Sequence, residues 1–148
     1  PMDCFIAGLL HDFGKVVLAQ FLPGELRQDL GMSQQQGLSL HLALRETLGV
    51  DHAVVGAMLV EKWRFASQLV QTIRHQYGPE LVDSDMVACV FAANQISKKL
   101  QFGFAGNLLV EEFPPSVAKR LGGTLDGVIA GLGDLTPLFE EAKIFSKI

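Results

Sequence analysis

The chain has 148 residues, a length at which one hydrophobic core and one domain are expected. An apolar fraction of 49% with a charged fraction of 19% excludes an intrinsically disordered chain, because disordered chains lack the apolar surface needed to fold. The net charge of −4, with no basic cluster longer than Lys98-Lys99, argues against nucleic acid as a partner. No uncharged apolar run approaches the roughly 18 residues of a membrane-spanning helix, so no membrane span is expected.

The N-terminal segment has the most regular apolar pattern of the chain. Apolar residues recur there at helical spacing, at Phe5, Ile6, Leu9, Leu10, Phe13, Val16 and Val17. Similar runs follow along the chain, and strand-type alternation is weak throughout. The sequence therefore predicts an all-α domain, a compact bundle of about eight helices.

Gly, Pro and short polar residues mark the ends of these helices. Among the predicted stops are Pro23-Gly24, Gly31 and Gly37. The segment Gln34-Gln35-Gln36 is predicted to lie in a loop. Each of three residues precedes a periodic run and is a predicted N-cap: Ser39, Asp51 and Ser84.

The longest predicted helix runs from about Asp85 to Leu100. Its period places Asn94 on the same side as Val87, Val90, Phe91 and Ser97, so Asn94 is expected to face the interior. From Gly106 onward the predicted helices are short and no polar group is placed for chemistry. We interpret that last third as packing structure.

Two cysteines, Cys4 and Cys89, lie in separate apolar stretches. We interpret them as reduced, buried thiols rather than as a disulfide, which indicates a cytoplasmic protein. The start Pro1-Met2-Asp3 lacks the basic residue of a secretory signal, and we interpret it as cut from a longer chain.

The segment Leu9-Leu10-His11-Asp12-Phe13-Gly14-Lys15 places polar groups inside the most apolar predicted helix. A buried carboxylate is costly without a partner, so Asp12 needs a hydrogen-bonding network or a cation. An imidazole and a carboxylate at adjacent positions can both reach a metal that lies between them. Lys15 is expected to pair with Asp12 or to extend to solvent, and in an enzyme it could contact a phosphate.

Further ligands would have to come from other helices. Each of the candidates lies on a separate predicted helix: His52, His75 and Asn94, with His41 in a leucine-rich helix left outside the set. Inward imidazoles and carboxylates on neighbouring helices are how helical bundles hold divalent metals. The alternative is that each histidine is a hydrogen-bonded core or helix-end residue, and both interpretations stay open at this point.

Four segments in order resemble the HDOD family, bacterial signal-output relatives of the HD-domain metal-dependent phosphohydrolases. The segments are Ala7-Gly8-Leu9-Leu10-His11-Asp12-Phe13-Gly14-Lys15, Leu48 to Trp63, Ile73-Arg74-His75-Gln76, and Val90-Phe91-Ala92-Ala93-Asn94-Gln95-Ile96. The likeness extends from about Ala7 to Gly103. It implies one HD-type helical domain over residues 1–148 that lacks the helices which precede Ala7 in such domains.

The departures from this pattern decide what the resemblance implies for activity. Asn94 stands where the active phosphohydrolases have an aspartate, and an amide oxygen is a weaker metal ligand than a carboxylate. Gln76 replaces the second histidine of a usual pair. The Gly-Tyr-Pro stretch of the cyclic-dinucleotide phosphodiesterases is missing, because Gln76-Tyr77-Gly78-Pro79 only scrambles its letters.

The resemblance therefore implies a non-catalytic signalling module without a cofactor, acting by conformational switching or by binding signalling proteins or a second copy. The alternative is a phosphohydrolase acting on a nucleotide or phosphoester. In that case Fe, Mn, Zn or Mg would be bound by residues from His11, Asp12, His52, His75 and Asn94. Lys15 would then steady the phosphate.

Overall fold

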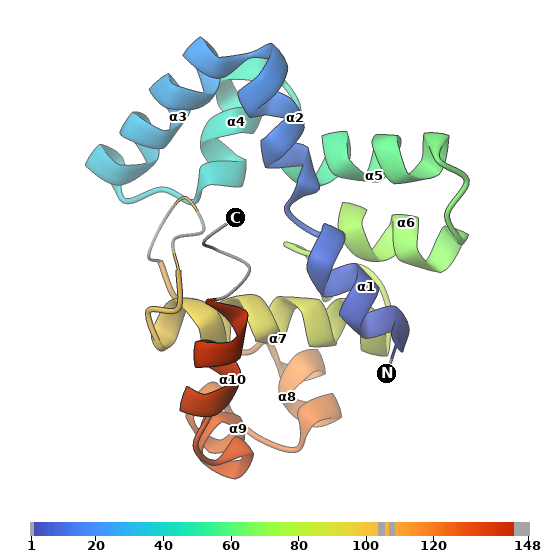
Figure 1. Ribbon diagram of the computed structural model, residues 1–148, viewed down its shortest axis with the longest axis vertical. Helices are drawn as coiled ribbons and strands as arrows, with labels where there is room; N and C mark the ends of the chain where they lie inside the picture. Colours follow the sequence, from blue (N-terminus) through green and yellow to red (C-terminus); the bar gives the residue numbers. More distant parts are fainter. Residues whose placement is uncertain (1, 104–105, 107–108, 144–148) are drawn as a thin grey trace.

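The computed structural model describes residues 2–103, 106 and 109–143, and these residues form an all-α fold in which they make no strand. The predicted fold class is confirmed (Figure 1). The helices are α1 (Met2–Leu10), α2 (Phe13–Phe21), α3 (Pro23–Gln36), α4 (Leu40–Leu48), α5 (His52–Lys62), α6 (Ser67–Arg74), α7 (Asp85–Lys99), α8 (Pro115–Leu121), α9 (Leu125–Leu132) and α10 (Thr136–Ala142).

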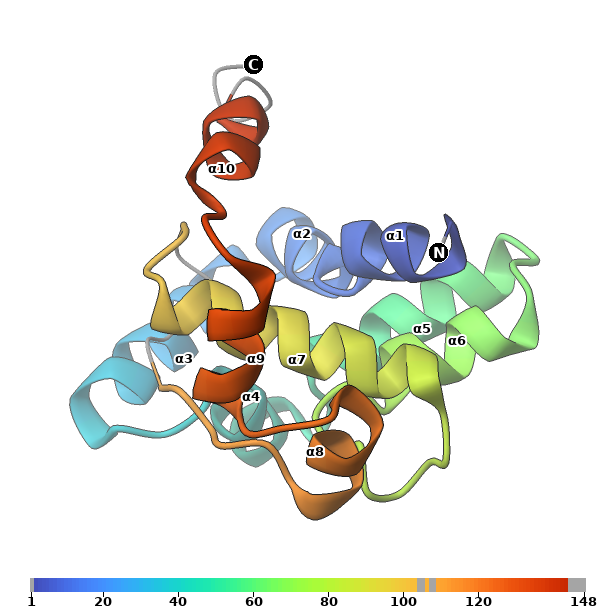
Figure 2. The ribbon, with the colours of Figure 1, turned by 90° about the horizontal axis from the view of Figure 1, so that it is seen from below.

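Among the described residues the core consists of three clusters, and two of them include residues of α7, which crosses the middle of the molecule (Figure 1). The largest cluster joins α1, α5, α6 and α7 through Ala7, Ala57, Val60, Leu69, Val70, Ile73, Met86 and Val90. A second cluster packs α8 against α7 through Phe91 and Val117. The third holds α2, α3 and α4 together through Leu18, Leu40 and Leu44. Figure 2 shows α10 standing away from this body, and none of its residues is buried.

Two of the three predicted N-caps are confirmed. The Asp51 carboxylate accepts a hydrogen bond from the Val54 amide at 2.9 Å, and Ser84 Oγ accepts one from the Val87 amide at 3.4 Å. Ser39 precedes α4 with an extended backbone, but its side chain makes no capping bond. The boundaries of α7 agree with the predicted helix.

The prediction of a stop at Gly31 and a loop over Gln34–Gln36 is wrong. Helix α3 continues through Gly31 and ends at Gln36, because the left-handed backbone that terminates it is supplied by Gly37 at φ 64°. A glycine inside a helix costs about 1 kcal/mol relative to alanine, which is too little to end it. Pro23 is the first residue of α3, where its fixed φ suits a helix start.

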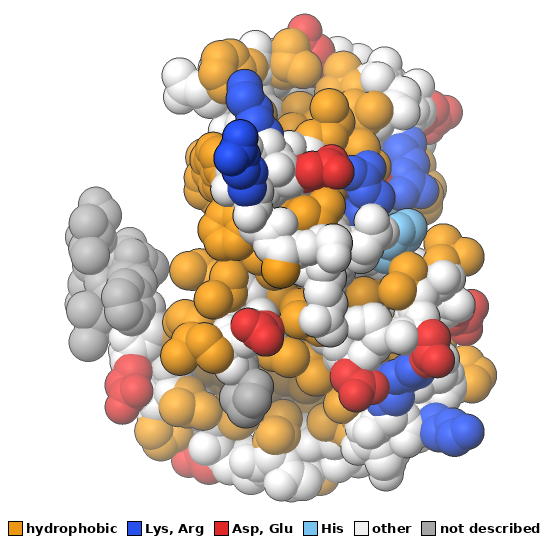
Figure 3. Space-filling view, turned by 90° about the vertical axis from the view of Figure 1, so that its right-hand side faces the viewer, with side chains coloured by type: hydrophobic (Ala, Val, Ile, Leu, Met, Phe, Trp, Pro, Cys, Tyr) orange, Lys and Arg blue, Asp and Glu red, His pale blue; other side chains and the backbone are white. Residues whose placement is uncertain are grey.

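Large apolar side chains are also exposed, and Figure 3 shows many of them on one face of the molecule. Trp63 is 49% exposed at the end of α5 and meets the ring of Phe13 edge-on at 5.5 Å. In α1, the apolar stripe divides between the core and the surface. Ala7 is buried, whereas Met2, Phe5 and Leu9 are more than 60% exposed.

Length and composition alone single out one stretch of the described residues as able to cross a membrane, Met2–Phe21, with a mean hydropathy of 1.3. Core helices and signal sequences pass the same test. Here the stretch is divided by the polar turn at His11 and Asp12 into α1 and α2. The expectation that the chain has no membrane span stays a prediction.

The backbones of α2 and α5 lie in close contact where the two helices cross. A Cβ on Gly14 would overlap the carbonyl oxygen of His52, and one on Gly56 would lie 3.2 Å from the Gly14 nitrogen. Only glycine permits this contact. It places the first turn of α5 beside the turn that precedes α2.

Candidate functional site

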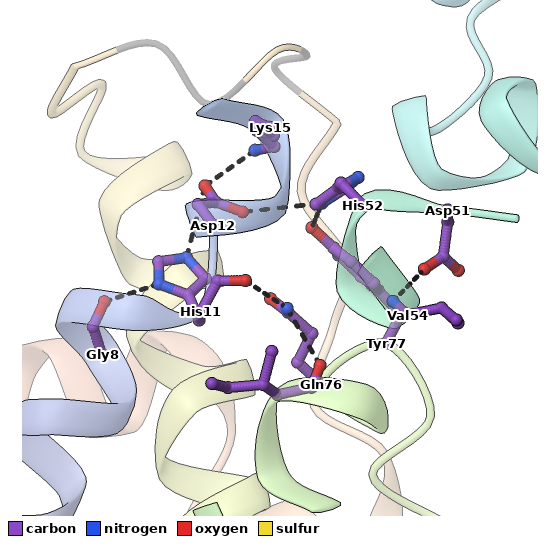
Figure 4. Close-up of polar contacts among 10 residues, drawn as sticks. Gly8, His11, Asp12, Lys15, Asp51, His52, Val54, Gln76 and Tyr77 are labelled. Atoms are coloured by element: carbon purple, nitrogen blue, oxygen red, sulfur yellow. Dashed lines mark hydrogen bonds and ion pairs between the residues drawn. The ribbon is translucent and has the colours of Figure 1, made fainter. Parts of the chain in front are cut away.

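The His11–Asp12 turn between α1 and α2 is the centre of a polar cluster (Figure 4). Lys15 Nζ donates a hydrogen bond to Asp12 Oδ2 at 2.7 Å, as the sequence predicted. His11 Nδ1 lies 2.6 Å from the Gly8 carbonyl oxygen, so Nδ1 carries the proton and donates it. That bond orients the ring, and His11 Nε2 lies 3.4 Å from Asp12 Oδ2.

His52 approaches Asp12 from the start of α5. Its side chain is 1% exposed, with Nε2 at 3.5 Å from Asp12 Oδ1 and 2.6 Å from Tyr77 Oη. The preceding residue, Asp51, holds this turn in place, because it caps α5 and accepts a bond from Arg45 Nε at 2.6 Å. Among the described residues, no group hydrogen-bonds to His52 Nδ1 or to Asp12 Oδ1.

The charges of the cluster follow from these contacts. Burial alone would raise the pKa of Asp12, but the close contact with the His52 side chain and the charges of His11 and Lys15 outweigh it and hold that pKa well below its usual value. Burial lowers the pKa of His52 and raises the pKa of Tyr77. Asp12 is therefore a carboxylate, His52 a neutral imidazole and Tyr77 an intact phenol at neutral pH.

Sequence reasoning missed three partners in this cluster. The His41 ring stacks on the Tyr77 ring with centroids 4.2 Å apart and planes 9° from parallel. Gln76 Nε2 donates to the carbonyl oxygens of His11 at 2.7 Å and Ile73 at 3.1 Å. The sequence feature that could have indicated His41 is an imidazole beside a leucine in a leucine-rich helix. For Gln76 and Tyr77 the corresponding feature is two polar side chains directly after the end of a helix.

Acidification is expected to destabilise the domain partly through His41. Burial lowers the pKa of His41 to about 4, whereas an unfolded imidazole titrates near 6.5. Because the folded state binds the proton less readily, the His41 contribution to the free energy of unfolding is complete above pH 6.5 and is lost as the pH falls toward 4. In urea unfolding measured at a series of pH values, His41→Phe, which keeps a stacking ring, should lose less stability over that range than the wild type. An NMR titration that places the His41 pKa near 6.5 would contradict this.

A cavity of about 310 Å³ opens beside the cluster, between α1 and α7. It is lined by Gly8, His11, Asp12, Val90, Ala93, Asn94, Ser97 and Phe102. Asn94 therefore lies on the same cavity as the His-Asp pair, on the opposite wall. It is partly exposed rather than buried.

The structure thus brings together His11, Asp12, Lys15 and His52, with Asn94 across the cavity. His75 is at the end of α6, and its hydrogen-bond partner is Gln71 of its own helix, 3.1 Å from Nε2. No described contact joins His75 to Asp12 or His52. Its neighbour Gln76 is the residue that reaches the cluster.

The donor set can be compared with what a divalent metal requires. Two imidazoles, a carboxylate and an amide are chemically suitable ligands. However, the Lys15 ammonium occupies the space next to Asp12 Oδ2, and a second cation on that oxygen would be repelled. In the part of the chain that is described, no three His, Cys, Asp or Glu side chains are grouped as a metal site. The Lys15 ammonium would therefore compete with any other cation for Asp12 Oδ2.

The described residues form an all-α bundle with a His-Asp pair at the junction of α1 and α2. The sequence profile of the HDOD domain matches residues 1–79, more than half of the chain, and the chain belongs to the HDOD domain family.

Two solved structures are similar to this chain. A crystal structure of an HDOD domain protein with unknown function from Geobacter sulfurreducens matches 94% of this chain and 52% of its own, with 27% identity and a TM-score of 0.77. A Shewanella amazonensis protein provisionally named a phosphohydrolase shares the fold, with 24% identity and a TM-score of 0.63 over 96% of this chain and 50% of its own.

An uncharacterised protein of Treponema pallidum (strain Nichols) is 29% identical over 76 residues, which are 51% of this chain and 15% of that protein. The chain therefore spans about half the length of the two similar structures and a smaller share of the Treponema protein.

Proposed function

We propose that this HDOD domain is a non-catalytic signalling module that works by conformational change and protein binding. The observation that carries the proposal is the ion pair of Asp12 with Lys15 at 2.7 Å, because Asp12 lines the cavity where a hydrolase would hold its metal. The carboxylate charge is balanced by the protein itself. With Asn94 on the facing wall, too little negative charge is left to bind and activate a metal-bound water.

The same cluster is suited to pass on a change of conformation. Its contacts connect the α1–α2 junction at Asp12 with α4 through His41, with α5 through His52, and with the segment after α6 through Gln76 and Tyr77. A partner that shifts one of these elements has to break or move hydrogen bonds to the others. A conformational switch requires two arrangements of such contacts that differ in energy, and we propose that a partner selects between them.

The proposed partners are other signalling proteins or a second copy of this chain. Exposed apolar side chains on α1 support this proposal, because a protein interface buries such side chains. We also propose that the protein is bacterial and cytoplasmic and that its cysteines are reduced.

A metal-dependent phosphohydrolase is the second candidate function. The observation in its favour is that His11, Asp12 and His52 converge beside an open cavity of about 310 Å³. The fold shared with the Shewanella protein is consistent with it. In this case a bound metal would supply an activated water, and His11, Asp12 and His52 would hold it.

Metal binding separates the two functions. Purified protein stripped with a chelator and titrated with Mn²⁺ or Zn²⁺ should bind well below one equivalent at the site, as measured by elemental analysis and calorimetry. In the double variant Lys15→Met with Asn94→Asp, the ammonium is removed and a carboxylate is added, so affinity should rise by about tenfold or more. Lys99→Met is the control, because Lys99 pairs with Asp126 away from the cavity.

Stoichiometric metal in the wild type, together with hydrolysis of a phosphoester that depends on Asp12, would overturn the signalling proposal. An unchanged affinity in the double variant, with its fold intact by circular dichroism, would show that charge at Asp12 and Asn94 is not what limits metal binding.

A further inference from the structure

A second pocket lies at the C-terminal end of α7. It has a volume of about 280 Å³, and its lining includes Lys98, Lys99, Gln101, Val110 and Glu112. Among the described residues, this pocket and the cavity between α1 and α7 have no lining residue in common. The pocket therefore offers chemistry that the proposed signalling function does not use.

Lys98 is a nearly buried lysine in the wall of this pocket. It is only 9% exposed, and lysines are rarely buried to that extent without a partner. In the part of the chain that the structure describes, no carboxylate forms an ion pair with Lys98. Burial without such a partner disfavours the charged ammonium and favours the neutral amine.

The segment after α7 encloses Lys98. Gln95 lies three positions before Lys98 on α7, so the two residues share a face of that helix. Gln95 is buried, and its Oε1 accepts a hydrogen bond from the Glu111 amide at 2.8 Å. This bond holds the chain at Glu111 against α7, and its neighbours Val110 and Glu112 line the pocket. The wall opposite α7 is thus fixed through the backbone.

Lys99, the next residue, lines the same pocket in a different environment. It is exposed, and its Nζ lies 2.5 Å from Asp126 Oδ1 on α9. This ion pair raises the pKa of Lys99, so its side chain stays a cation at neutral pH. Two adjacent lysines of one pocket therefore favour opposite protonation states.

The charges around Lys98 modify the effect of its burial. Burial lowers the pKa of Lys98, the charges of Glu111 and Asp12 oppose that shift, and the charge of Lys15 adds to it. The lowering prevails. At neutral pH a larger fraction of Lys98 than of Lys99 is therefore the neutral amine, which is the nucleophilic form.

We propose that Lys98 is acylated by a small acyl phosphate, which places a lasting covalent modification on α7. The reagent has to be small, because about 280 Å³ is below the roughly 300–1,000 Å³ of pockets for drug-sized ligands. The Lys99 ammonium can bind the phosphate group while the Lys98 amine attacks, because its exposed ion pair with Asp126 exchanges easily. This inference holds whether the domain signals or hydrolyses a substrate.

The reaction is a single acyl transfer. The neutral Nζ of Lys98 attacks the carbonyl carbon of the acyl phosphate and forms a nitrogen–carbon bond. The carbon–oxygen bond to the phosphate breaks, and inorganic phosphate leaves with the electron pair of that bond. The nitrogen loses one proton to water, which gives an amide. Because an amide is neutral, the modified side chain can remain in the pocket without the cost of burying an ammonium.

The test is incubation of the folded chain with acetyl phosphate at neutral pH. Tandem mass spectrometry of peptides separates the two adjacent lysines. Lys98 should be acetylated at least about tenfold faster than Lys99 and the exposed Lys62. The rate at Lys98 should level off at a lower pH than the rate at Lys62, because its neutral fraction saturates earlier. In urea, where the pocket is lost, Lys98 and Lys99 should react at similar rates.

Lys99→Met tests the choice of an acyl phosphate. The variant should slow the acetylation of Lys98 by acetyl phosphate about threefold or more, because the cation that binds the phosphate is lost. With p-nitrophenyl acetate, an uncharged acyl donor, the rate at Lys98 should not change. An equal loss of rate with both donors would overturn the role of the phosphate group and with it the proposed class of reagent.

Two further results would overturn the proposal as a whole. One is equal acetylation of Lys98 and Lys99 in the folded protein. The other is a preference for Lys98 that persists in urea, because that preference would come from the local sequence and not from the pocket. Metal titration tests the signalling proposal separately, since it concerns the cavity at Asp12 and Asn94.

Discussion

Gly14→Ala is expected to destabilise the domain by about 3 kcal/mol or more, because the added methyl group overlaps the backbone of α5 at His52. The atom in its way is a backbone oxygen, so no side chain can rotate to make room. Relief requires α2 and α5 to separate, and this opens the contact between Asp12 and His52. Chemical denaturation followed by circular dichroism measures the loss.

Gly31→Ala is the matched control. It makes the same replacement inside α3, where an added methyl group meets nothing within 4 Å. Alanine is the better helix former, so this variant should be up to about 1 kcal/mol more stable than the wild type. Equal effects of the two replacements would show that the α2–α5 crossing tolerates separation, contrary to the close packing described above.

Asp12→Asn is expected to cost about 2 kcal/mol at neutral pH. The replacement keeps the size of the side chain but leaves the Lys15 ammonium without its anion and weakens the contacts to His11 and His52. The value is set below that of a fully buried pair because the Asp12 side chain is 29% exposed. Asp126→Asn, on an exposed carboxylate that pairs with Lys99, should change stability by less than about 0.5 kcal/mol.

The cost of Asp12→Asn should depend on pH in one direction. The folded state holds the pKa of Asp12 well below its value of about 3.8 in an unfolded chain. The stabilisation by this carboxylate is therefore present above about pH 4 and is lost as the pH falls below that value. The difference in unfolding free energy between the wild type and the variant should be constant from pH 7 to 5 and shrink below pH 4. A difference that grows in acid would contradict the ion-pair assignment.

Local signals predicted the elements whose ends are determined locally. Ser84 caps α7 through its own side chain, and Asp51 caps α5 in the same way, so both helix starts could be read from the sequence. Gly31 and the glutamines after it were misread because a helix continues through an isolated glycine when nothing else ends it. The position that does end α3, Gly37, differs from Gly31 in its backbone angle, which composition alone does not show.

The candidate site was predictable only in part. His11, Asp12 and Lys15 are neighbours along the chain, and His52 follows a cap, so their polar character within apolar segments marked them. His41 and Tyr77 join the cluster because α4 and the segment after α6 meet there in three dimensions. The two rings are 36 positions apart in the sequence (77 − 41), so no local sequence pattern predicts that they stack. His75 was a natural choice by spacing, but the end of α6 directs its neighbour Gln76 to the cluster.

The single tryptophan and the single tyrosine give this domain two native optical probes. Trp63 touches Phe13 at the α2–α5 crossing and is half in solvent, so its fluorescence emission should shift to longer wavelength when those helices separate. Tyr77, bonded to His52 and stacked on His41, should keep its phenol absorbance into strong alkali until the fold opens. Emission and absorbance together can follow the opening of the helix crossing and of the polar cluster as separate events, without any attached label.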